Sequence, residues 1–394
     1  MAAVLPVYYS KVAGSLLQAQ TATSYWGYTN TLAMLLVALC APFVGATADY
    51  RGNKLKFLGF LALLGIFSTA LLYFVQTGDW ILASCLYMVG FIGFSSANIF
   101  YDSLLLSVAT YDTIDHISSL GYAAGYLGGG ILLAINTAMI LSPGWFGISS
   151  SEMGIRLSFL SVSVWWLLFM IPLFLYVNEP FVQNRGATLV NPFRDVSKTL
   201  KELKKYRNAF IFLIAFWLYN DGIGTIIKMA AIFGSEIGIG ANHLIGAILA
   251  VQFIGFPFTI LFARLAKKIS ARRAIYVGLV VYTGITIGGY FMQTALHFWI
   301  LAVAVGMVQG GTQALSRSLF AIMIPQAKAA EFFGFFDMSQ KFSGIVGPAL
   351  FGFVGYLCGS SRVGIVALIV FFLGGMYLLH RVRIGEKVAG QVSI

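Results

Sequence analysis

Four ionisable side chains lie inside or against apolar stretches of this 394-residue sequence, namely Asp102, Arg317, Asp337 and Lys341. An ionised group near the centre of a bilayer costs roughly 2.5 to 3.5 kcal/mol on insertion scales, so such groups usually pair or face a water-filled path. Asp337 and Lys341 are four residues apart and can pair on one helix surface. The second interpretation is that all four residues exchange partners when a cytoplasmic gate opens.

A fifth ionisable group, Asp221, follows Tyr219 and Asn220 in another apolar stretch. A buried carboxylic acid that faces the two sides of a membrane in turn can carry a proton, so we expect a proton or solute site at these three residues. Asp102 is the second choice for the carrier. The alternative for Asp221 is an end cap that faces water. Two glycines close behind it are expected to loosen the helix.

Uncharged side chains that form hydrogen bonds accompany these charges. Their amide and hydroxyl groups favour a small polar solute, which is the substrate class that we expect. The transport pathway and its gate are predicted to comprise Asn98, Tyr101, Asp102, Gln313, Arg317, Asp337 and Lys341.

The residue pattern gives no support for catalysis. The sequence contains no Ser-His or carboxylate-pair constellation, and its four histidines and three cysteines are scattered. It also lacks a Gly-x-x-x-x-Gly-Lys-Ser/Thr nucleotide-binding motif, so coupling to a proton or another ion gradient is the natural supposition. We therefore expect no catalytic residue, no metal and no cofactor.

Composition assigns the chain to the membrane. Hydrophobic residues make up 59% of it and charged residues 10%, and the mean hydropathy is +0.86, whereas about a quarter of a typical soluble domain is charged. The formal net charge is +11. Because the basic residues lie in short loops, they indicate cytoplasmic loops and contacts with anionic lipids rather than nucleic-acid binding.

Apolar segments long enough to cross a bilayer as helices recur along the chain. The short apolar stub at 1–9 is interpreted as the end of a first helix that is mostly missing. The distribution of basic loops places the C-terminus in the cytoplasm. Eleven full-length spans are predicted at 24–47, 55–76, 80–106, 118–141, 155–177, 207–227, 242–263, 273–293, 297–324, 331–357 and 362–380.

The longest polar segment divides the spans into two groups. It carries an amphipathic pattern typical of a helix on the membrane surface, and a plain basic linker is the alternative. We predict an N-terminal bundle at 1–177, a basic cytoplasmic linker at 178–206, a C-terminal six-helix bundle at 207–380 and a cytoplasmic tail at 381–394.

The two groups of spans are similar in sequence. At an offset of 215 residues, Asn98 aligns with Gln313 and Asp102 with Arg317. Two six-span halves in the same orientation are a known transporter plan, with a midplane site and alternating access. The repeat therefore predicts an all-α membrane protein with two pseudo-symmetric halves.

A loop motif joins two early spans and consists of Gly45, Asp49, Gly52 and Lys54. Asp49 can accept hydrogen bonds from backbone N–H groups at the start of a neighbouring helix, where negative charge is favoured. A weaker copy at 264–273 has Lys267 at the place of Asp49. We interpret both loops as conformational latches.

One predicted span contains a run of small residues, Gly121, Gly125, Gly128 and Gly129. Small residues at four-residue spacing allow helices to approach closely. Close packing is therefore the first interpretation, and a helix that slides or bends during transport is the second.

Several short runs of residues together resemble one transporter family. They are Phe100-Tyr-Asp102, Gly125-Tyr-Leu-Gly-Gly-Gly130, Tyr219-Asn-Asp-Gly222, Gln309-Gly-Gly311, Gln313-Ala-Leu-Ser-Arg-Ser318, Glu331-Phe-Phe-Gly334 and Gly347-Pro348. Their combination resembles the vacuole effluxers related to autophagy, and more closely their prokaryotic branch of unknown major facilitator transporters. The loop motif described above is similar to the signature of the major facilitator superfamily. Family members carry an aromatic-acid motif in a first helix, and this sequence begins after it.

The resemblance implies a twelve-helix major facilitator fold and, for the fungal vacuolar members, amino-acid export. We expect a monomeric secondary transporter in a prokaryotic cytoplasmic membrane, working by alternating access with a proton or another ion. A non-transporting membrane sensor or assembly partner, a lipid scramblase and an intramembrane enzyme are the alternatives; the paired halves disfavour the enzyme.

Overall fold

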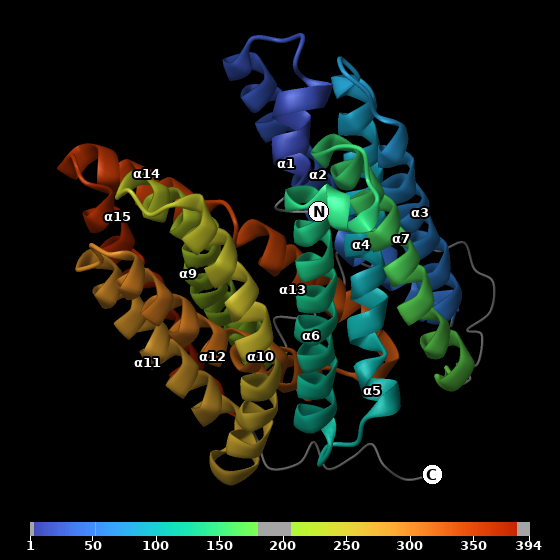
Figure 1. Cartoon of the computed structure of the whole chain (residues 1–394). Helices are drawn as coiled ribbons and strands as arrows, with labels where there is room; N and C mark the ends of the chain where they lie inside the picture. The colour runs from blue at the N-terminus through green and yellow to red at the C-terminus, as the bar shows by residue number, and fades with distance from the viewer. Residues whose placement is uncertain (1–3, 52, 180–205, 384–394) are drawn as a thin grey trace. The chain divides into compact units, whose positions relative to one another are not determined.

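The computed structural model describes residues 4–51, 53–179 and 206–383, and every regular element in these ranges is a helix (Figure 1). In a bilayer a helix satisfies its own backbone hydrogen bonds, which is why an apolar chain of this kind folds into long helices. The predicted amphipathic helix of the linker, Gly52 and most of the predicted tail lie outside the described residues.

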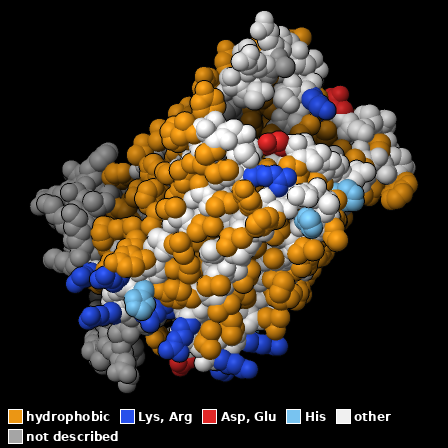
Figure 2. Space-filling view, turned by 90° about the vertical axis from the view of Figure 1, so that its left-hand side faces the viewer, with side chains coloured by type: hydrophobic (Ala, Val, Ile, Leu, Met, Phe, Trp, Pro, Cys, Tyr) orange, Lys and Arg blue, Asp and Glu red, His pale blue; other side chains and the backbone are white. Residues whose placement is uncertain are grey.

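Ten helical segments in the described ranges are long and apolar enough to cross a membrane, and a short N-terminal helix precedes them. The eighth of the eleven predicted spans, at 273–293, coincides with α11 (Ala271–Tyr290), which is not among the ten and begins with two arginines after Ala271. Figure 2 shows hydrophobic side chains over most of the face that it presents, with Lys and Arg side chains gathered along its lower edge. The all-helical membrane class is confirmed.

The chain forms two compact units, which are described separately. Unit 1 comprises Met1–Val108, Gly128–Pro192 and Ala330–Lys341. Its helices are α1 (Leu5–Tyr8), the π-helix Tyr9–Ala13, α2 (Ala19–Arg51), α3 (Lys54–Leu71), α4 (Trp80–Ser103), α5 (Leu105–Val108), the second part of α6 (Ile114–Leu141), α7 (Ser151–Tyr176) and nearly all of α13 (Ala329–Phe342).

Unit 2 comprises Ala109–Leu127, Phe193–Ala329 and Phe342–Ile394. It contains the first part of α6, α9 (Arg207–Glu236), α10 (Ala241–Ile269), α11, α12 (Ala295–Ala321), α14 (Val346–Cys358), α15 (Ser361–Ala367) and α16 (Ile369–Arg381). Short 3-10 turns lie at Leu72–Phe74, Pro143–Phe146 and Gln326–Lys328. Each predicted bundle is one continuous range of residues, whereas the two compact units divide α6 after Leu127. The predicted bundle boundaries stay a prediction.

Helix boundaries follow the internal repeat. α4 begins at Trp80 and α12 at Ala295, which is the offset of 215 residues found in the sequence. α2 ends at Arg51 and α10 at Ile269, at the offset of 218 that relates the two basic loops. Corresponding residues of the repeat therefore lie at corresponding places along corresponding helices.

The N-terminal stub packs into unit 1. Tyr8 and Tyr9 are fully buried there together with Phe159. The Tyr8 hydroxyl donates to the carbonyl oxygen of Val75 at 2.8 Å, and the Tyr9 hydroxyl lies 2.9 Å from Ser84 Oγ. These contacts join residues 5–13 to the helices that follow.

Candidate functional site

The predicted span at 331–357 is interrupted. α13 ends at Phe342, α14 begins at Val346, and the three residues between them form a turn. Pro348 has no backbone N–H, so the carbonyl oxygen of Gly344, four residues earlier, lacks its helical donor. Interrupted helices inside membranes need other partners for such groups, and they commonly form the binding sites of transporters.

Side chains of α9 supply those partners. Asn220 Nδ2 donates to Ser343 Oγ at 2.7 Å, and Lys228 Nζ donates to the Gly344 carbonyl oxygen at 3.3 Å. Asp221 Oδ1 accepts from the N–H of Gly347 at 3.0 Å, so it caps the first turn of α14 with a negative charge. The interruption in one helix is therefore matched to three polar residues of another.

Asp221 is the acid of this group, and it is buried. Its side chain is 0% exposed, and within the described residues Oδ2 has no hydrogen-bond partner. Its own carbonyl oxygen accepts from Thr225 Oγ1 at 2.7 Å. A water-facing end cap, the alternative for Asp221, is wrong, because the carboxyl group is enclosed by protein.

A glycine is required beside Asp221. A Cβ atom at Gly347 would overlap Thr225 Oγ1 and would lie 2.8 Å from Asp221 Oδ1. The Gly347-Pro348 pair thus serves two purposes: the glycine lets the backbone N–H reach the carboxylate, and the proline leaves a carbonyl oxygen for Lys228.

The expectation that Gly222 and Gly224 loosen α9 is wrong. α9 runs without a break from Arg207 to Glu236. A Cβ atom at Gly222 would lie 2.8 Å from the Phe372 ring, so this glycine serves the close approach of α16. The loosened backbone is opposite Asp221, in the turn before α14.

Tyr219 is fixed by hydrogen bonds within unit 2. Its hydroxyl lies 2.6 Å from Ser316 Oγ, and Ser316 Oγ itself donates to the Thr312 carbonyl oxygen at 2.7 Å. Because the serine proton is used in that bond, the tyrosine is the donor in the first. Tyr219 is only 1% exposed, so it holds α9 against α12.

Arg317 is buried between α12 and the first part of α6. Its Nε donates to Ser118 Oγ and its Nη2 to the Ser118 carbonyl oxygen, both at 2.9 Å. The guanidinium carbon lies 4.7 Å from the centre of the Tyr122 ring. On the next residue, Ser318 Oγ donates to Asp115 Oδ1. These contacts lock the two helix ends together.

The sequence reading missed Asp115, Ser118 and Tyr122. They follow one another at spacings of three and four residues, so they share one face of α6. A polar face on an apolar helix was the signal that could have identified them.

Asp337 and Lys341 form the local pair. The distance from Lys341 Nζ to Asp337 Oδ1 is 3.5 Å, and Nζ lies 5.2 Å from the centre of the Phe91 ring. Asp102, in the same unit, interacts electrostatically with Asp337. Arg317 belongs to unit 2, so partner exchange among all four residues stays a prediction.

The remaining predicted pathway residues differ in exposure. Tyr101 is 41% exposed, whereas Asn98 is half-buried on α4. Gln313 Oε1 accepts a long hydrogen bond of 3.4 Å from the Tyr126 hydroxyl. Their contact with a solute stays a prediction.

The expected contact of Asp49 with a helix start is present. Asp49 Oδ2 accepts from the N–H of Glu331 in the first turn of α13 at 2.7 Å, while Lys54 Nζ lies 2.8 Å from Oδ1. A Cβ atom at Gly45 would overlap the Ala330 carbonyl oxygen, so glycine is needed for this approach. The role of this loop as a latch stays a prediction.

The close-packing interpretation of the glycine run is not supported at two positions. A Cβ atom at Gly125 or Gly129 would meet no atom within 4 Å, and one at Gly128 would make only an ordinary contact of 3.7 Å with Trp165. α6 passes from unit 2 to unit 1 between Leu127 and Gly128. Bending of α6 at the run stays a prediction.

No cluster of metal-ligating side chains occurs within the described residues. The polar groups reported above instead contact one another and the ends of helices.

Comparisons with known proteins identify the family of the chain. The family model "Vacuole effluxer Atg22 like" matches residues 10–114 and 106–389. The chain is 38% identical over 394 residues to the uncharacterized MFS-type transporter YxiO of Bacillus subtilis (strain 168), covering 99% of this chain and 92% of that protein. It is 25% identical to autophagy-related protein 22 of Yarrowia lipolytica, covering 92% and 76% of the two chains.

Solved structures show the same fold. The proton:xylose symporter XylE has a TM-score of 0.71 at 15% identity and covers 96% of this chain and 90% of its own. The Escherichia coli fucose:proton symporter FucP has a TM-score of 0.67 at 13% identity and covers 97% and 98%. The family match confirms the resemblance found in the sequence: the chain belongs to the Atg22-like family of vacuole effluxers and is a non-enzymatic transporter with the major facilitator fold.

Proposed function

We propose that this transporter is a secondary active one, which moves a small polar solute by alternating access and couples that movement to protons through Asp221. The observation that carries the proposal is the fully buried Asp221 carboxyl group at the interrupted helix, with Oδ1 on the Gly347 N–H and Oδ2 without a hydrogen-bond partner in the described chain. Keeping a carboxyl group charged inside a membrane span costs free energy. The group can therefore take up and release a proton, as coupling requires.

The contacts around Asp221 give this coupling a physical route. As a carboxylate, Asp221 attracts the N–H of Gly347 and the positive end of α14. A proton on the carboxyl group removes that charge and weakens the cap. Asn220 and Lys228 still contact the turn at 343–345, so protonation loosens the contact between α9 and the start of α14.

The solute and the direction of transport are further parts of this proposal. The family is described as vacuole effluxers, which supports export, and the sequence resemblance implies amino acids as the first solutes to test. The Bacillus relative supports a prokaryotic cytoplasmic membrane. Two solved neighbours are proton symporters of sugars; their likeness to this chain extends to the fold alone.

Two assays in proteoliposomes distinguish exchange of the solute from its coupling to protons. Counterflow of a radiolabelled amino-acid mixture measures exchange, and accumulation driven by an imposed pH gradient measures coupling. We expect Asp221→Asn to keep counterflow and to lose the gradient-driven accumulation. Asp112→Asn, which changes an exposed loop acid, is the matched control and should keep both. Gradient-driven accumulation by Asp221→Asn equal to that of the unaltered protein would exclude Asp221 as the carrier.

A further inference from the structure

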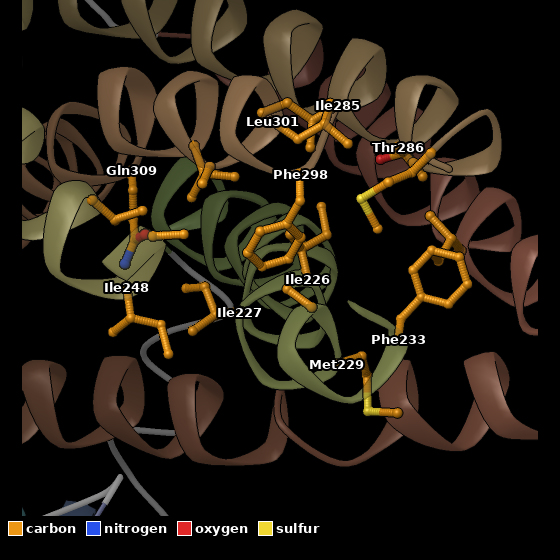
Figure 3. Close-up of a pocket in the computed structure, with 18 of the residues that line it drawn as sticks. Ile226, Ile227, Met229, Phe233, Ile248, Ile285, Thr286, Phe298, Leu301 and Gln309 are labelled. Atoms are coloured by element: carbon orange, nitrogen blue, oxygen red, sulfur yellow. The ribbon is translucent and has the colours of Figure 1, made fainter. Parts of the chain in front are cut away.

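Unit 2 contains a cavity that differs in chemistry from the Asp221 site. The cavity is partly open, and its volume is about 170 Å³. Residues of α9, α10, α11, α12, α14 and α15 line it, and most of them are apolar. In Figure 3, Phe298 and Ile226 lie in the middle of the cavity, with Phe233 and Met229 toward one end.

The opposite end of the cavity is polar. Gln309 lies there beside Ile248 (Figure 3). Gln252 is one helical turn from Ile248 on α10, so its amide is at the same end. Gln309 lies within hydrogen-bonding reach of the Tyr126 hydroxyl, whereas the structure shows no hydrogen bond from the Gln252 side chain within the described residues.

The remaining polar lining group is already satisfied. Thr286 Oγ1 donates to the Tyr282 carbonyl oxygen at 2.7 Å. None of the lining residues carries a charge. Burying an ionised ligand group here would leave it without a counter-charge, at a large cost, whereas an uncharged head could exchange hydrogen bonds with the two amides.

We propose that this cavity is a binding site for an uncharged amphiphile, whose apolar body fills the space around Phe298 and Phe233 and whose single hydrogen-bonding head contacts Gln252 and Gln309. The site is separate from that of the polar solute, because the cavity offers that solute few partners. The bilayer around the protein supplies molecules of this kind, so the occupant is membrane-derived. The proposal stands whether or not Asp221 carries protons.

The test uses the full chain in lipid nanodiscs and two photoactivatable probes of equal length, a twelve-carbon diazirine alcohol and the matching carboxylate. Cross-linked residues are mapped by mass spectrometry. We expect the alcohol to label lining residues such as Met229 and Phe298 saturably. We expect the carboxylate to label them about tenfold less, because its charge must be buried.

Variants distinguish the cavity from the lipid-facing surface. Ala302→Trp fills the cavity and should abolish lining labelling, while Val303→Trp, next along α12 and 36% exposed outside the lining, should leave it unchanged. Gln252→Leu nearly keeps the side-chain volume and removes the free amide, so it should weaken labelling by the alcohol. It keeps the proposal testable if Ala302→Trp fails to fold.

Three results would overturn the proposal: labelling confined to surface residues, lining labelling that persists in a folded Ala302→Trp protein, or equal lining labelling by the alcohol and the carboxylate. Amino-acid counterflow measured on the same preparations reports separately on the proposed transport function. A loss of counterflow with intact lining labelling therefore bears on that function and not on this site.

Discussion

Lys228 donates to the carbonyl oxygen of Gly344, and that oxygen is the one that Pro348 leaves without a helical donor. The ammonium group of α9 thus replaces a backbone N–H at the interruption between α13 and α14. Because Asp221 binds the N–H of Gly347 in the same region, Asp221 and Lys228 of α9 together satisfy both sides of the broken backbone.

Lys228→Met should lower the free energy of unfolding by about 1 kcal/mol, the usual net value of one hydrogen bond, because the Gly344 carbonyl oxygen then has no donor. Pro348→Ala restores a backbone N–H at residue 348. The Lys228 substitution should therefore cost much less in the Pro348→Ala background, as measured by denaturant unfolding of all four proteins in a double-mutant cycle.

Lys267→Met is the matched control, because Lys267 is exposed near the end of α10. It should change stability little in either background. An equal loss from Lys228→Met with and without Pro348 would show that the Gly344 contact contributes nothing to stability.

Gly347→Ala should destabilise the protein by about 1 to 3 kcal/mol, the usual cost of an overpacked site. Its new Cβ would overlap Thr225 Oγ1 and press on Asp221. Thr225→Ala removes the overlapping oxygen, so the double variant should recover part of the loss. The measurement is thermal unfolding in detergent.

Gly352→Ala, in the same helix, is the control for glycine replacement in general, because a Cβ there meets nothing within 4 Å. It should be neutral or slightly stabilising, since alanine favours the helix. If Gly347→Ala behaves like Gly352→Ala, the close approach of α14 to Asp221 is not required.

Lys341→Met should cost about 3 to 5 kcal/mol of stability, the range found when one partner of a buried ion pair is removed. Asp337 is only 6% exposed, so its carboxylate would remain buried without the ammonium group 3.5 Å away. Asp337→Asn removes the charge and should rescue much of the loss in the double variant. Comparable stability of Lys341→Met with and without Asp337→Asn would contradict this account.

Much of the helical architecture could be predicted because its signal is local. Long apolar runs define the spans, and the repeat at 215 residues places the starts of α4 and α12 at equivalent positions. Asp49 could also be assigned to a helix start, because glycines on either side of it and a nearby lysine are typical of such a loop.

The parts that could not be predicted depend on contacts between distant segments. The turn at 343–345 lies inside an apolar run, and only Pro348 indicated that a carbonyl would lack its donor. Gly222 was misread because its close neighbour, Phe372, is 150 residues away. The partners of Arg317 were missed because Ser118 and Tyr122 each look like ordinary polar residues near a helix start.

Arg317→Lys tests whether the shape of the guanidinium group matters in addition to its charge. Arginine reaches both Ser118 oxygens and stacks on Tyr122, whereas a lysine offers a point charge without this fork. We expect stability losses of about 1.5 to 3 kcal/mol for Arg317→Lys, more for Arg317→Gln, and about 1 kcal/mol for Ser118→Ala, which keeps the backbone acceptor. Denaturant unfolding of these variants measures the three stability losses and their order.

Counterflow at matched expression tests the proposed gate role of the same residue. Both Arg317 variants should slow it, and Arg207→Gln, which removes an exposed charge from the start of α9, should not. Normal counterflow by Arg317→Gln would exclude the gate role. Normal stability of the folded Arg317→Lys protein would instead show that the two hydrogen bonds to Ser118 do not hold α6 against α12, because the lysine cannot reproduce them.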